Sequence, residues 1–68
     1  MPMSEAALCY SLIEQLTRAG YVFRIAHDKR KGGLWYLLSI PDMDGHDEAL
    51  SAGITLSEAL SSYAKKVL

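Results

Sequence analysis

An acidic stretch is the first group of residues in this sequence that could do chemistry. Acidic side chains gather in PDMDGHDE, residues 41–48, and oxygen-rich loops of this composition can bind calcium. An EF-hand loop needs glycine at its sixth place and glutamate at its twelfth, whereas counting from Asp42 puts Asp47 and Gly53 there. The pattern therefore favours a solvated turn, and we expect no metal site.

The single cysteine is the candidate nucleophile. Cys9 could be grouped with His27 and an aspartate for catalysis, or with His27 and His46 as zinc ligands. Neither grouping has the spacing of a known site, and no glycine-rich phosphate loop leads into a helix. In a chain of 68 residues, this predicts a non-enzymatic protein without a cofactor.

A basic group is the third candidate. Lys29, Arg30 and Lys31 follow one another, and Trp35 and Tyr36 come soon after. Cations beside aromatic side chains suit RNA, through phosphate contacts and base stacking. The alternative is a solvated turn that keeps a hairpin soluble. Because the formal net charge of −1 gives no general attraction to nucleic acid, a nucleic-acid-binding module is our second hypothesis.

Two helices would position these groups. Leu8, Leu12 and Leu16 recur at helical spacing after Ser4, a plausible N-cap, and Gly20 suits the end of that helix. Near the other end of the chain, Thr55 and Glu58 form a T-x-x-E capping box, with Ile54 placed as the preceding staple residue. The apolar stripe of this second helix consists of Leu56, Leu60, Tyr63, Ala64 and Val67.

The middle of the chain predicts a hairpin. Residues 21–28, YVFRIAHD, alternate as a strand does, and the glycines of DKRKGG permit the positive φ angles of a turn. A second strand from about Leu34 to Ile40 ends before Pro41. Residues 46–54 could form a third strand, a helical turn or a loop, and we favour a short edge strand.

The fold class that follows is α+β, with the order α-β-β-(β)-α in a single domain, residues 1–68. A small antiparallel sheet would carry two helices packed on it. If both helices lie on one face, the other face is uncovered and apolar, which is typical of a contact surface; if they lie on opposite faces, no such patch exists. The candidates for an uncovered face are Val22, Arg24, Ala26, Trp35 and Leu37. Of these we expect Val22, Arg24, Trp35 and Leu37 to contact a protein partner or a second copy of the chain, with Trp35 as the main contact.

Part of the chain resembles the HicB antitoxin family. From Tyr21 onward, a hairpin leads into SIPDMDG and then into AGITLSEAL, which is similar to that family's proline-aspartate and G-x-T-x-x-E-A-L patterns. The matching positions are Pro41, Asp42, Gly45, Gly53, Thr55, Glu58, Ala59 and Leu60. The chain also resembles small phage-encoded helix-strand-strand-helix sandwich proteins of unknown function, through GY-F-I and G-T-SEA. The HicB resemblance implies an antitoxin-like or inhibitor-like regulatory module that neutralises a protein, whereas the phage resemblance covers the whole length but implies no activity. Together they suggest a bacterial or phage origin.

Composition predicts the compartment. The lone Cys9 excludes an internal disulfide, and MPMSEAALCY lacks the basic start of a signal peptide. No apolar run is long enough to cross a bilayer. We therefore expect a cytoplasmic protein that does not bind membranes.

Overall fold

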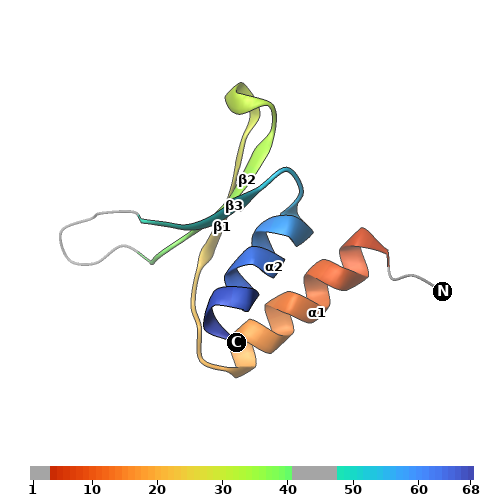
Figure 1. Cartoon of the computed structure of the whole chain (residues 1–68), viewed down its shortest axis with the longest axis vertical. Coiled ribbons are helices and arrows are strands. Elements are labelled where there is room, and N and C mark those ends of the chain that lie inside the picture. Colours follow the sequence, from red (N-terminus) through yellow and green to blue (C-terminus); the bar gives the residue numbers. More distant parts are fainter. Residues whose placement is uncertain (1–3, 41–47) are drawn as a thin grey trace.

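The computed structural model of the chain describes residues 4–40 and 48–68. Its elements are α1 (Glu5–Arg18), β1 (Arg24–Asp28), the 3-10 turn η1 (Lys29–Lys31), β2 (Leu34–Leu38), β3 (Ala49–Gly53) and α2 (Leu56–Val67). The three strands form one antiparallel sheet in the order β1-β2-β3 (Figure 1). The α+β class is therefore confirmed, and the ambiguous segment contributes the edge strand β3.

Local signals in the sequence set the bounds of α1. The Ser4 side chain accepts a hydrogen bond from the backbone N–H of Ala7, 3.1 Å away, as an N-cap does. At the other end, Gly20 has φ of 94°, and the N–H of Tyr21 donates to the carbonyl of Leu16. This is the bonding of a Schellman motif, which stops the helix and turns the chain toward the sheet.

The turn between β1 and β2 fixes how these strands pair. Asp28 caps η1 by accepting from the N–H of Arg30, and Gly32 and Gly33 both have positive φ. The turn places Asp28 opposite Leu34, and Ile25 is therefore opposite Leu37. Both strands are shorter than expected, because β1 begins at Arg24 and β2 ends at Leu38.

The start of α2 is held by a modified capping box. Thr55 Oγ1 accepts from the N–H of Glu58, and the Glu58 carboxylate accepts in return from the N–H of Ile54. The prediction that Ile54 packs as a staple is wrong, since its side chain is 70% exposed. Gly53 faces α2, and the alternation of the strand turns the next residue, Ile54, away from it.

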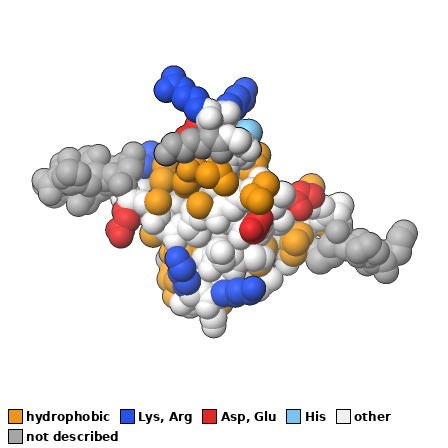
Figure 2. All heavy atoms as spheres, turned by 45° about the horizontal axis from the view of Figure 1, so that its top comes forward, with side chains coloured by type: hydrophobic (Ala, Val, Ile, Leu, Met, Phe, Trp, Pro, Cys, Tyr) orange, Lys and Arg blue, Asp and Glu red, His pale blue; other side chains and the backbone are white. Residues whose placement is uncertain are grey.

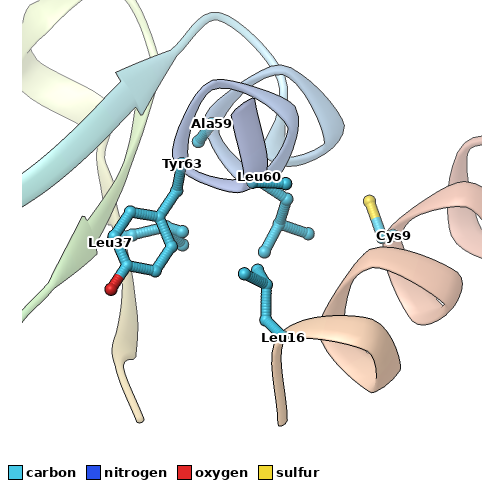
Figure 3. Packing of buried hydrophobic residues seen from close by; sticks show 7 residues of the cluster. Cys9, Leu16, Leu37, Ala59, Leu60 and Tyr63 are labelled. Atoms are coloured by element: carbon cyan, nitrogen blue, oxygen red, sulfur yellow. The ribbon is translucent and has the colours of Figure 1, made fainter. Parts of the chain in front are cut away.

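Helix α2 is the middle layer of the molecule. It contacts β2 and β3 on one side and α1 on the other (Figure 1). In Figure 3, Ala59 and Tyr63 lie toward Leu37 of the sheet, while Leu60 meets Leu16 of α1. Leu16, Leu37 and Leu60 are fully buried, and each contributes roughly 1.5–3 kcal/mol by leaving water.

Small residues of β3 let α2 approach the sheet closely. Ser51 is buried, and its hydroxyl donates to the carbonyl of Ala59 over 2.7 Å. A Cβ atom added at Gly53 would lie 2.6 Å from the backbone N of Ala59 and 2.8 Å from Cβ of Glu58. Only glycine therefore fits at position 53, because a Cβ atom there would overlap the backbone of α2.

We expect Gly53→Ala to destabilise the fold by about 1–3 kcal/mol, because α2 must move away from β3 to admit the methyl group. Urea denaturation would measure the loss. Ala19→Ser, at an exposed position just after α1, is the control and should leave the free energy of unfolding nearly unchanged. Equal stability of Gly53→Ala and the unmodified chain would contradict the role given to this contact.

Candidate functional site

The four residues expected on one uncovered sheet face do not share a surface. Trp35 pairs with His27, and Leu37 pairs with Ile25. Both of these cross-strand pairs lie on the face of the sheet that carries the helices. Leu37 is fully buried in the core, and its prediction as an exposed contact is wrong. Trp35 packs against the same core but remains half-buried, with one ring face stacked on His27 at a centroid distance of 4.2 Å.

Val22 and Arg24 occupy other places. Val22 precedes β1 and is 71% exposed. Arg24 lies on the face opposite the helices, where its guanidinium donates through Nε and a terminal nitrogen to the carbonyl of Ser39, both at 3.3 Å. Arg24 and Leu37 therefore belong to opposite faces of the sheet.

The face of the sheet away from the helices is here called the outer sheet face. Ala26, Tyr36 and Ala52 form one cross-strand row on it, and Leu34 and Leu38 flank Tyr36 on the same side of β2. No helix among the described residues packs on this face. The Tyr36 hydroxyl has no hydrogen-bond partner within residues 4–40 and 48–68. Of the residues expected on an uncovered face, Arg24 and Ala26 lie on the outer sheet face, whereas Trp35 and Leu37 lie on the other.

The basic group lies at the tip of the hairpin. Lys29, Arg30 and Lys31 form η1, and the side chains of Lys29 and Arg30 are exposed. Figure 2 shows blue side chains projecting from this tip, with hydrophobic side chains gathered below them. Trp35 and Tyr36, the expected stacking partners, point to opposite faces of β2 and do not form one platform beside the tip.

An apolar groove lies between α1 and the hairpin, and the sequence analysis did not identify it. Its volume is about 680 Å³, and it is open to solvent along one side. The lining residues are Glu5, Ala6, Cys9, Tyr10, Ile13, Trp35, Thr55 and Leu56. The spacing of Ala6, Tyr10 and Ile13 at i, i+4 and i+7 was the available signal, because it widens the apolar stripe of α1 beyond what α2 covers.

Glu5 closes one end of the groove and joins the two helices. Its carboxylate accepts a hydrogen bond from the N–H of Ser57, 3.2 Å away at the start of α2. Hydrogen bonds from Ser57 hold the pKa of Glu5 below its ordinary value. The carboxylate is therefore ionised at neutral pH, near the N-terminal ends of both helices.

Cys9 lies beside Glu5 in this groove. Burial raises the pKa of the Cys9 thiol, and the Glu5 carboxylate raises it further. The thiol is therefore protonated at neutral pH, and a protonated thiol is a poor nucleophile. The groove is chemically suited to bind apolar groups.

The predictions for the acidic stretch lie mostly outside the described residues, which include only Glu48 of residues 41–48. Within residues 4–40 and 48–68, no three histidine, cysteine or acidic side chains are arranged to hold a metal ion. The same residues contain no helix of the length and apolar character needed to cross a membrane.

Comparison with known proteins gives no match to any protein-family model, to any curated protein or to any solved structure. The resemblance to HicB antitoxins therefore stays a prediction. Of its matching positions, Pro41, Asp42 and Gly45 lie outside the described residues. The remainder are Gly53 at the end of β3, the N-cap Thr55, and Glu58, Ala59 and Leu60 in the first turns of α2.

We expect the contribution of Glu5 to stability to depend on pH. Its pKa is lower in the folded than in the unfolded chain, so the stabilisation is fully present above the ordinary carboxyl value of about 4.3 and is lost as pH falls through the folded pKa. Glu5→Gln keeps an acceptor for Ser57 but removes the charge. Urea denaturation across this pH range should show a difference between the two chains at neutral pH that disappears in acid.

Glu14→Gln is the control, because it removes the same charge from the same helix at a carboxylate whose ion pair is with Arg18 of α1 itself. An equal effect of both substitutions at every pH would contradict the role of the Glu5–Ser57 contact.

Proposed function

We propose that this chain is a non-enzymatic binding module that acts by protein–protein contact through its outer sheet face. The observation that carries the proposal is the apolar row on this face, with Tyr36 at its centre and no helix of the described chain covering it. Tyrosine is enriched at interfaces because it combines a large apolar ring with a hydroxyl that can hydrogen-bond.

A second copy of the chain is the occupant that the charges on this face favour. Arg24 and Asp28 lie at opposite ends of β1, both on the outer side. When two such faces pack across a two-fold axis with antiparallel strands, the arginine of each copy lies toward the aspartate of the other. A chain of 68 residues with three large side chains fully buried also gains from covering further apolar surface.

Dimerisation is tested by substituting two matched tyrosines. Tyr36 lies on the outer sheet face, and Tyr10 is exposed on α1 on the opposite side of the sheet. Sedimentation equilibrium should show a dimer for the unmodified chain and for Tyr10→Lys. Tyr36→Lys should raise the dissociation constant about thirtyfold or more, since a central interface tyrosine is worth about 2 kcal/mol or more.

Far-UV circular dichroism would establish that both variants remain folded. A dimer lost in Tyr10→Lys but kept in Tyr36→Lys, or a chain that is monomeric throughout, would overturn the proposed contact.

A nucleic-acid-binding module is the second candidate, and the hairpin tip is the observation that favours it. Lys29 and Arg30 are exposed and form no ion pair within the described part of the chain. Phosphate contacts weaken steeply with salt, whereas an apolar docking face is far less sensitive. A pull-down from native lysate, with and without nuclease and at two salt concentrations, separates these two functions by the protein and nucleic acid in the eluate.

A further inference from the structure

The apolar groove is a second surface, separate from the outer sheet face. Its lining comes from α1, from Trp35 of β2 and from the start of α2, all on the helix side of the sheet. Five of the lining residues, from Glu5 to Ile13, lie along one side of α1 over about 12 Å of helix axis. Because this surface is largely open to solvent, it fits a segment of another chain better than a small molecule, which pockets usually enclose.

The negative charge at one end of the groove favours a partner segment that carries basic residues. Glu5 is the charged residue in the lining, and Glu58 lies in the first turn of α2 beside Thr55. The N-terminal ends of the two helices offset roughly half a charge each, which leaves about one negative charge in excess. The lining contains no lysine or arginine, and the rings of Trp35 and Tyr10 add surfaces to which a cation is attracted.

We propose that the groove binds an amphipathic helix of a partner protein that carries basic residues beside its apolar stripe. The apolar stripe would lie between α1 and Trp35, as helices lie in the hydrophobic grooves of other binding proteins. A basic residue at one end would reach the Glu5 carboxylate, which is exposed at the rim. Because the groove and the outer sheet face lie on opposite sides of the sheet, both surfaces can be occupied at the same time.

Trp35 makes the proposal measurable, because it is the single tryptophan of the chain and it lines the groove. The probes are two synthetic amphipathic helices of about three turns, without tryptophan, that share one leucine stripe. One is flanked by lysine and the other by glutamate. Titration should change the Trp35 fluorescence with the lysine-flanked peptide, and the glutamate-flanked peptide should bind at least about tenfold more weakly.

Two neighbouring alanines provide a matched pair of variants. Ala6 and Ala7 are both exposed in the first turns of α1, but Ala6 alone of the two lines the groove. Ala6→Arg should weaken binding of the lysine-flanked peptide at least about tenfold. Ala7→Arg makes the same change of charge and size, and should alter the affinity by no more than about twofold.

Three results would overturn the proposal: no binding of the lysine-flanked peptide, equal affinity for both peptides, or equal effects of the two arginine substitutions. Conversion of a dimer to a monomer by Ala6→Arg but not by Ala7→Arg would identify a second copy as the occupant and would also overturn it. Tyr36→Lys should bind the peptide as the unmodified chain does, so this proposal and the proposed dimer contact can fail separately.

Discussion

The close contact between α2 and β3 is the constraint on which the rest of the structure depends. With no side chain at Gly53 and a hydrogen bond from Ser51 to the carbonyl of Ala59, the helix backbone lies directly on the strand. In this position α2 buries one side against β2 and β3 and the other side against α1. Tyr63 meets Tyr21 and Phe23 edge to face before β1, and Leu60 provides the surface against which α1 packs.

The contact between α2 and β3 also determines which surfaces of the sheet the helices leave uncovered. Because both helices lie on one side of the sheet, the outer sheet face has no helical cover among the described residues. Because α2 reaches β2 and β3 but not much of β1, the inner side of the hairpin is also incompletely covered, and Ile25 is 42% exposed. The groove between Trp35 and α1 has the same cause, because the two helices do not cover the whole inner side of the hairpin.

The elements could be predicted from the sequence because their signals are local. Ser4, Gly20, Thr55 and Glu58 act within a few residues of themselves, and each has the bonding that its type suggests. The side-chain direction in β2 could not be predicted this way. Residues 34–38, LWYLL, are all apolar and show no alternation, so the pairing depends on the conformation of the η1 turn. The groove needs contacts between three elements distant in sequence, and no local pattern specifies those.

The layered order of sheet, α2 and α1 has a consequence for how the molecule opens. Since α1 packs chiefly on α2, it can separate without breaking any hydrogen bond of the sheet. Such local opening has a lower free energy than global unfolding. Amide protons of α1 should accordingly exchange with solvent sooner than those shared by β2 and its two neighbours. Helix α1 is thus joined to the rest of the molecule by side-chain packing and by the Glu5–Ser57 hydrogen bond, and not by the hydrogen bonds of the sheet.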